Sequence, residues 1–219
     1  MPLALRVVEN PALQGLLLRL RDQGTPRHRF RELLELAGLL LAYEAAPRLP
    51  TRRRRVVTPL QAEATGLEPA GDRVVVVAVL RAALPMAMGV LRLLEDAELG
   101  LVAATRLEDR PRLPDGGFEV ETPYWKTPRI RGRHLVIVDP MLATGSTLAR
   151  ITERLLAEEP SAVTVLNLIA TRQGIERLEE ALKDVDAALY TAAVDPVLDE
   201  RGYIVPGLGD AGDRCFGEA

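Results

Sequence analysis

The sequence predicts an α/β domain with a mainly parallel, twisted sheet flanked by helices. Short apolar stretches typical of strands alternate with helical stretches from residue 73 to residue 194, and the first of them, Val74–Leu80, contains no polar residue. Such an uninterrupted run is typical of a strand covered on both faces, as in parallel sheets. A chain of 219 residues with 47% hydrophobic content can bury one sizeable core, so we expect a single domain over residues 1–219.

Two amphipathic helices are predicted over about residues 11–45. In the first, Pro11–Asp22, leucines recur at helical spacing. The second begins at Thr25, an N-cap residue followed by a proline at the first helical position. Its apolar residues share one face as far as about Ala45, and prolines at positions 47 and 50 prevent its continuation.

Two clusters of arginine lie outside these helices. Arg52–Arg55 is a run of four that leads into two valines, whereas Arg129, Arg131 and Arg133 alternate with other residues. We interpret both clusters as solvated strand edges, where basic side chains discourage pairing with other chains. A nucleic-acid or phosphate-binding patch is the alternative that the sequence leaves open.

The remaining predicted elements form the α/β alternation itself. Parallel strands are joined by right-handed crossovers, and ligands bind outside the carboxyl ends of the strands. The expected strands are Val74–Leu80, Leu99–Thr105, His134–Asp139, Ala162–Ala170 and Ala187–Val194, and the expected helices are Leu84–Leu94, Ser146–Glu158 and Gly174–Lys183.

Two segments fall outside this alternation. Glu108–Arg133 contains four prolines and an Asp-Gly-Gly turn, and a hairpin such as Phe118–Glu121 fits this pattern. Loops of this length inside a compact domain are usually functional, so we interpret residues 108–133 as a lid over the active site. The other segment, from Asp199 to the end, is rich in glycine and has no helical period.

The strongest chemical motif runs from the end of the strand at residues 134–139 into the next helix. Asp139 is a carboxylate at the strand end, placed to accept hydrogen bonds from the vicinal hydroxyls of a ribose. Gly145 allows close approach of the backbone to a ligand, and the helix start offers N–H groups to a phosphate. Thr144, Ser146 and Thr147 add three hydroxyls. The alternative interpretation, a plain strand-to-helix turn with Ser146 as N-cap, leaves Asp139 and this hydroxyl cluster unexplained. A Walker nucleotide-binding loop is excluded because the motif has no lysine.

This motif resembles the 5-phosphoribosyl 1-diphosphate (PRPP) loop of type I phosphoribosyltransferases, in the form found in uracil phosphoribosyltransferases. The resemblance implies the type I fold, with a lid hairpin and a C-terminal hood. It also implies that Asp139 binds the ribose of PRPP. The residues implied to surround the 5-phosphate are Pro140, Met141, Leu142, Ala143, Thr144, Gly145, Ser146 and Thr147.

The tail carries a second resemblance to the same family. Gly207–Gly212 satisfies the G-x-G-x-x-G pattern of dinucleotide-binding folds, but only seven residues follow it, too few for the required strand-helix-strand unit. Gly202–Arg214 instead resembles the uracil-recognition segment of uracil phosphoribosyltransferases. The resemblance implies that Asp210 faces PRPP and that backbone groups around three residues read the pyrimidine edge: Ile204, Gly209 and Ala211.

Arg81 and Arg106, each at the end of a predicted strand, correspond to family positions that contact the diphosphate. Arginine suits this task because its planar fork binds phosphate oxygens in pairs. Departures from the family pattern include Ser146, in place of a glycine, and Thr171-Arg172, in place of an Ala-Pro pair.

The resemblance implies transfer of the phosphoribosyl group of PRPP to uracil, giving UMP and pyrophosphate. The implied catalytic residues are Asp139, Arg106 and Asp210, because neither His28 on a surface helix nor His134 at a strand start is a convincing base. Mg²⁺ is expected to enter mainly through PRPP, with no protein side chain assigned as a metal ligand. A homodimer or homotetramer and a GTP effector are further expectations from the family.

Composition limits the alternatives. The net charge of −3 does not favour a general nucleic-acid trap. The lone Cys215 fits a reducing compartment, and without a signal peptide or membrane span we expect a cytoplasmic protein with no membrane contact. The alternatives kept are a paralogue with altered base choice and an RNA-binding pyrimidine regulator that uses Arg52–Arg55 and Arg129–Arg133.

Overall fold

The computed structural model describes residues 3–107, 110–113 and 116–218, and within them an eight-stranded sheet forms the centre of the molecule. All neighbouring strands pair in parallel except the last pair, β5 and β6. The strand order is β1 (Ala4–Val7), β10 (Ala187–Asp195), β9 (Ala162–Thr171), β7 (His134–Val138), β4 (Val74–Leu80), β5 (Glu98–Arg106) and β6 (Val120–Lys126), with β8 (Met141–Leu142) paired to β9. The predicted mainly parallel sheet is confirmed.

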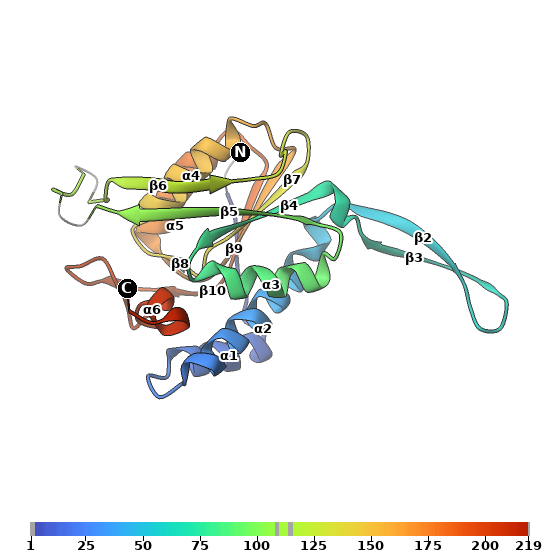
Figure 1. Ribbon diagram of the computed structural model, residues 1–219, viewed down its shortest axis with the longest axis horizontal. Coiled ribbons are helices and arrows are strands. Elements are labelled where there is room, and N and C mark those ends of the chain that lie inside the picture. Colours follow the sequence, from blue (N-terminus) through green and yellow to red (C-terminus); the bar gives the residue numbers. More distant parts are fainter. Residues whose placement is uncertain (1–2, 108–109, 114–115, 219) are drawn as a thin grey trace.

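Helices cover both faces of this sheet (Figure 1). One layer contains α2 (Arg27–Ala45) and α3 (Ala83–Leu93), with α1 (Pro11–Arg21) packed on α2; the other contains α4 (Ser146–Leu156) and α5 (Arg172–Leu182). The helices α2 and α3 approach so closely that a Cβ at Gly38 would lie 2.0 Å from the carbonyl oxygen of Met86. The predicted helices are all present, with ends that differ by a few residues.

The segment of residues 108–133, for which we keep the name lid, contains a strand of the main sheet. Residues 108–109 and 114–115 lie outside the described part of the chain, but Val120–Lys126 is a regular edge strand of the main sheet, antiparallel to β5. The hairpin formed by β5 and β6 is therefore longer than the predicted Phe118–Glu121. Pro123 made this strand hard to recognise from the sequence, because proline is rare within sheets except in edge strands.

A second hairpin extends away from the molecule (Figure 1). It consists of β2 (Thr51–Val57) and β3 (Glu63–Pro69), paired antiparallel as a separate two-stranded sheet. The predicted solvated strand at Arg52–Arg55 is confirmed, whereas β3 was not predicted. A short 3₁₀ helix lies on each side of the hairpin, η1 (Ala46–Arg48) before it and η2 (Gly71–Arg73) after it.

The tail is more ordered than its sequence suggests. It contains β11 (Val197–Leu198), β12 (Ile204–Val205) and the short helix α6 (Ala211–Phe216). The helix contradicts the expectation of no helical structure; it begins because the Asp210 carboxylate accepts the N–H of Asp213 at 2.9 Å, as an N-cap. In Figure 1, α6 lies beside α1 and α2. No helix within the described residues is both long and apolar enough to cross a membrane.

Candidate active site at the carboxyl ends of the central strands

The strand order reverses at β4, because the chain continues from β4 to β5 on one side and later returns to β7 on the other. Ligands of open α/β sheets bind in the crevice outside such a switch point. Here Ala78 of β4 pairs with Val138 of β7, so the residues that follow the two strands, Arg81 and Asp139, leave neighbouring strands at the same edge of the sheet. Both are residues singled out from the sequence.

Asp139 is held rigidly and its carboxyl group is only partly exposed. Its Oδ1 accepts the N–H of Met141 at 3.1 Å, and its backbone carbonyl accepts Nδ2 of Asn167 at 2.8 Å. Burial raises the pKa of Asp139 to about 7, although the Met141 N–H and the charge of Arg106 oppose that rise. The carboxyl group is therefore poised near neutral pH, with a cation within electrostatic reach.

Gly145 forms the sharp turn between Asp139 and α4. Its φ of +79° lies in the left-handed region, and an added Cβ would lie 2.9 Å from the carbonyl oxygen of Gly174. The preceding peptide is fixed by Thr171, whose hydroxyl donates to the carbonyl of Ala143 at 2.7 Å. This turn leads directly into α4. Backbone N–H groups at the start of a helix point toward a bound anion, so the turn is suited to binding a phosphate.

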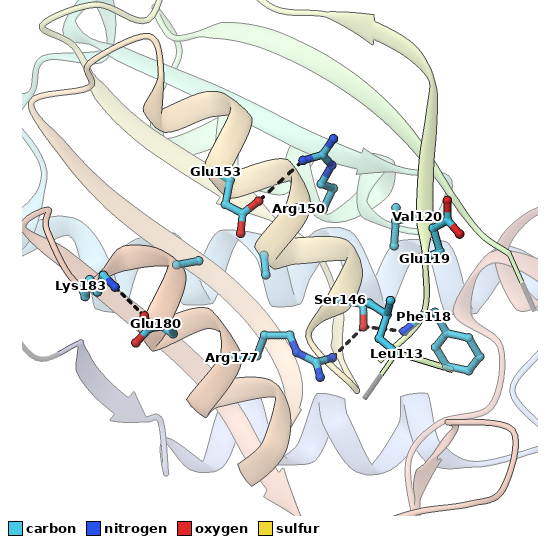
Figure 2. A pocket seen from close by; sticks show the side chains of 12 residues that line it. Leu113, Phe118, Glu119, Val120, Ser146, Arg150, Glu153, Arg177, Glu180 and Lys183 are labelled. Atoms are coloured by element: carbon cyan, nitrogen blue, oxygen red, sulfur yellow. Dashed lines mark hydrogen bonds and ion pairs between the residues drawn. The ribbon is translucent and has the colours of Figure 1, made fainter. Parts of the chain in front are cut away.

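The hydroxyls of Thr144 and Ser146 lie together and bond to other groups of the protein. The Ser146 hydroxyl bonds to that of Thr144 at 3.0 Å, and accepts both Nη1 of Arg177 at 2.7 Å and the N–H of Phe118 at 3.0 Å (Figure 2). Arg177 also donates to the carbonyl of Thr144 at 2.6 Å. The side chain of Ser146 thus faces α5 and the lid, and Thr147, next along α4, is partly buried.

Sequence reasoning missed Arg177, since an arginine on a helix has no pattern that distinguishes it. Figure 2 shows it beside a cavity of 690 Å³ between α4, α5 and the start of β6. Ion pairs join Arg150 to Glu153 at 3.8 Å and Lys183 to Glu180 at 2.5 Å along its wall. Its lining therefore mixes cations and carboxylates.

Three segments meet at Phe118: the lid, the C-terminal tail and the turn that precedes α4. The guanidinium of Arg106 lies 5.6 Å from the centroid of the Phe118 ring, and that of Arg112 lies 4.5 Å from it. A Cβ at Gly202 would lie 2.9 Å from Cε2 of Phe118 and 3.6 Å from Cγ2 of Thr144. The tail residue Gly202 is thus packed between the lid and the expected phosphate-binding turn, so segments far apart in sequence share one site.

Arg81 connects the end of β4 to the tail. Its Nη2 lies 2.8 Å from Oδ1 of Asp213, and its Nη1 donates to the carbonyl of Gly217 at 3.4 Å. Asp210 caps α6 as described, and its Oδ2 accepts the hydroxyl of Tyr203 at 3.4 Å. In this structure Arg81 and Asp210 thus have protein partners at the rim of the site.

The three residues expected to read the base are arranged along a tight turn of the tail. Ile204 and Ala211 are buried, while Gly209 is exposed and has a φ of +74°. Neither histidine belongs to this site: His28 lies exposed on α2, and His134 begins β7, at the opposite end of the strand from Asp139. Burial lowers the pKa of His134 to about 4, and its Nε2 lies 2.9 Å from the Thr164 hydroxyl.

Comparisons with known proteins agree along the whole chain. The family model for uracil phosphoribosyltransferase matches residues 7–218. The uracil phosphoribosyltransferase of Metallosphaera sedula is 39% identical over 217 residues, which cover 98% of this chain and 100% of that protein. The one from Aeropyrum pernix is 41% identical over 216 residues, which cover 98% of this chain and 97% of that protein.

Solved structures show the same architecture. A protein from Aquifex aeolicus superposes with a TM-score of 0.88 at 30% identity, covering 98% of this chain and 99% of that chain. A hypoxanthine-guanine phosphoribosyltransferase from Bacillus anthracis superposes with a TM-score of 0.51 at 18% identity, covering 77% and 82% of the two chains, a likeness of fold alone. The predicted type I phosphoribosyltransferase fold is confirmed.

Proposed function

The chain belongs to the uracil phosphoribosyltransferase family, and we propose that its catalytic centre lies where the ends of β4 and β7 meet the C-terminal tail. The reaction joins uracil to PRPP: N1 of uracil bonds to the anomeric carbon, the bond from that carbon to the diphosphate oxygen breaks, and the N1 proton leaves. The products are UMP and pyrophosphate. The observation that carries this proposal is the packing of Gly202 between Phe118 and Thr144, which brings the tail to the turn.

The turn and the strand ends divide the work on PRPP. We assign the 5-phosphate to the loop of residues 140–147, which supplies the N–H groups at the start of α4, and the ribose hydroxyls to Asp139. Arg81 and Arg106 would neutralise the departing diphosphate, since one follows β4 and the other ends β5 beside it. Holding both substrates in line can remove roughly 7–11 kcal/mol of the barrier, so positioning supplies much of the catalysis.

The tail supplies the base site in this proposal. Backbone groups of Ile204, Gly209 and Ala211 would bond to the pyrimidine edge, and Asp210 would face PRPP. Fixed amides discriminate well, because a base that cannot pair with them leaves buried polar groups unsatisfied. Membership of the uracil phosphoribosyltransferase family is why uracil, rather than another base, is the acceptor we propose.

Mg²⁺ fits the site as a cation carried by PRPP. Within the described residues no group of three His, Cys, Asp or Glu side chains forms a metal cage. Mg²⁺ usually keeps several waters and binds through one or two carboxylates plus substrate phosphates, which matches a site with Asp139 and few other carboxylates. When bound, it would neutralise negative charge on the diphosphate.

One assay tests the proposed function. The protein is incubated with PRPP, Mg²⁺ and, in separate reactions, uracil, orotate, hypoxanthine or adenine, and pyrophosphate release is followed. We expect release with uracil only, together with UMP. Release with another base instead would favour a paralogue with altered base choice. Salt-sensitive RNA binding without UMP formation would favour the regulator.

The structure gives the RNA-binding alternative little support, because carboxylates pair with five of the seven arginines in the two clusters. Arg52 alone contacts three of them, and Arg131 and Arg133 pair with glutamates at 3.2 and 2.9 Å. The partners of Arg52 are Glu68 at 2.8 Å, Asp72 at 2.9 Å and Asp96 at 2.9 Å. A surface balanced in this way has no excess of positive charge for a phosphate backbone.

We propose that the protein is a homo-oligomer, a dimer or a tetramer. The β2–β3 hairpin exposes several apolar side chains, among them Leu60 at 89% and Leu67 at 70%. An isolated two-stranded hairpin is marginally stable in water, so a second copy that covers it would explain why it persists. Sedimentation of the full chain tests this proposal, and a monomer at micromolar concentration would contradict it.

We also propose regulation by GTP and a cytoplasmic location. The 690 Å³ cavity has a volume suited to a small molecule and includes Arg150, Arg177 and Lys183, which could face phosphates. Activity measured with and without GTP tests the first proposal, and equal rates would contradict it.

The proposed cytoplasmic location rests on cysteine usage. The lone and buried Cys215 suits a reducing compartment.

A further inference from the structure

We propose that Arg21 and Asp195 are positioning residues for base recognition, which together fix both backbone polar groups of one residue in the base-reading turn. The inference rests on the proposed function, since it assumes that the tail reads uracil. Arg21 is the last residue of α1, and Asp195 is the last residue of β10, so neither belongs to the tail that they hold.

The geometry of the contact is specific. Arg21 and Asp195 form a bidentate pair, with Nη1 to Oδ2 and Nη2 to Oδ1 both at 2.7 Å. Asp195 Oδ2 accepts the N–H of Gly207 at 2.9 Å, and Arg21 Nη1 donates to the carbonyl of Gly207 at 2.7 Å. The two side chains are only 19% and 7% exposed. One ion pair thus satisfies the donor and the acceptor of a single residue.

Gly207 lies in the middle of the turn that is to read the base. Its φ is +57°, and an added Cβ would lie 2.0 Å from the carbonyl oxygen of Ile204, so the chain folds back tightly on itself here. Ile204 is three residues before Gly207 and Gly209 two residues after it. A shift of Gly207 would therefore move the proposed base-reading amides on both sides.

A second arginine fastens the same turn to α1. Arg214 Nη1 donates to the carbonyl of Leu208 at 2.8 Å and also to the carbonyl of Leu20. Its Nη2 donates to the carbonyl of Asp22 at 2.7 Å, and its guanidinium stacks 4.2 Å from the ring centroid of Phe30. The C-terminal end of α1 thus forms a platform for the turn, and Arg21 is the part of that platform aimed at Gly207.

Charge keeps the contact in place at neutral pH. Burial by itself would raise the pKa of Asp195, but the Arg21 hydrogen bonds and the Gly207 N–H outweigh that effect and lower it. The carboxylate stays ionised and accepts three hydrogen bonds, which are stronger than neutral ones. Removal of Arg21 would leave a buried charge without its partner, so conservative variants give the cleanest test.

The functional consequence follows from backbone readout. Fixed amides bind a small planar base only while their geometry is maintained, because a displaced amide leaves polar groups of the base unpaired. Most of the groups assigned to PRPP lie on other elements, the turn after β7 and the ends of β4 and β5, and only Asp210 lies in the tail. Loosening Gly207 should therefore weaken uracil binding much more than PRPP binding.

The test compares Asp195→Asn and Arg21→Lys with a matched control, Arg48→Met. Asp186, the partner of Arg48 at 2.5 Å, precedes β10 at its other end, so the control removes a more exposed Arg–Asp ion pair far from the tail. Asparagine keeps an oxygen for the Gly207 N–H but loses the charge, and lysine keeps the charge but cannot form the bidentate contact. Each variant is the full chain, checked for folding by circular dichroism.

We expect both variants at the Arg21–Asp195 pair to raise the KM for uracil about tenfold or more, with the KM for PRPP and kcat within about threefold of wild type. Hydrogen exchange of residues 204–209 should be faster in both variants than in the control. Equal KM values for uracil in variants and control, or equal rises for both substrates, would overturn the inference. If Asp195→Asn does not fold, Arg21→Lys decides alone. Wild-type protein that forms no UMP would overturn the proposed function instead.

Discussion

The carboxyl group of Asp139 should make PRPP binding depend on pH near neutrality. Its pKa of about 7, against 3.8 for an ordinary aspartate, means that about nine-tenths of it is ionised at pH 8 and about one-tenth at pH 6. Only the carboxylate accepts hydrogen bonds from both ribose hydroxyls. The KM for PRPP should therefore rise as pH falls below 7, by up to about tenfold per unit, the limit for one proton.

Asp139→Asn provides the matched variant, since asparagine has the same shape and cannot ionise. Hydrogen bonds to charged groups contribute about 1.5–3 kcal/mol, so its KM for PRPP at pH 8 should be about 10- to 100-fold higher than that of wild type. Its pH profile should retain only the titration of PRPP itself. An Asp139→Asn variant with wild-type KM, or with the same additional pH slope, would refute the ribose assignment.

The same pKa predicts an opposite effect on stability. The folded protein binds a proton at Asp139 between pH 4 and pH 7 that the unfolded chain has already released, so this group lowers the free energy of unfolding as pH rises through that window. Asp139→Asn should accordingly melt at a higher temperature than wild type at pH 8. A lower melting temperature at pH 8 would contradict the raised pKa.

Three further predictions concern other parts of the chain. Gly145→Ala should lower kcat/KM for PRPP at least tenfold, because the new Cβ would lie 2.9 Å from the carbonyl oxygen of Gly174 and the positive φ adds strain. Gly132→Ala is the control: its φ is +73° but the space around it is open, so kcat/KM should stay within about twofold of wild type. Arg52→Met should loosen the base of the β2–β3 hairpin, measured as faster hydrogen exchange of residues 51–69, and unchanged exchange would show that its ion pairs do not hold the hairpin. Burial raises the pKa of Cys215 to about 11, so its thiol should react with a disulfide reagent at pH 8 only after unfolding; prompt labelling of native protein would contradict this burial.

Much of the sheet could be predicted from the sequence because its central strands are buried on both faces. The mainly apolar runs of β4, β7 and β9 favour buried strands, and the turn after β7 combines a carboxylate with glycine in a way that points to a sugar phosphate. Edge strands have weaker patterns: β1 and β3 are exposed, and Pro123 interrupts β6. Burial, rather than strand propensity, determined what could be recognised.

The side chains that support the site could not be predicted, because their partners are distant in sequence. Arg21 and Asp195 are separated by 174 residues, and Arg177 lies 33 residues from Thr144. Before folding, each is one of many charged residues on a helix or at a strand end. The short helix α6 was missed for a related reason, since six residues carry too little periodicity to identify it.

A crystal structure with UMP bound tests the central claim most directly, because UMP carries both the phosphate and the base. The account predicts that the 5-phosphate lies against the N–H groups of the turn around Gly145, the ribose against Asp139, and the pyrimidine against the backbone of Ile204 and Gly209. A nucleotide bound elsewhere, or a pyrimidine that does not touch the tail, would contradict it.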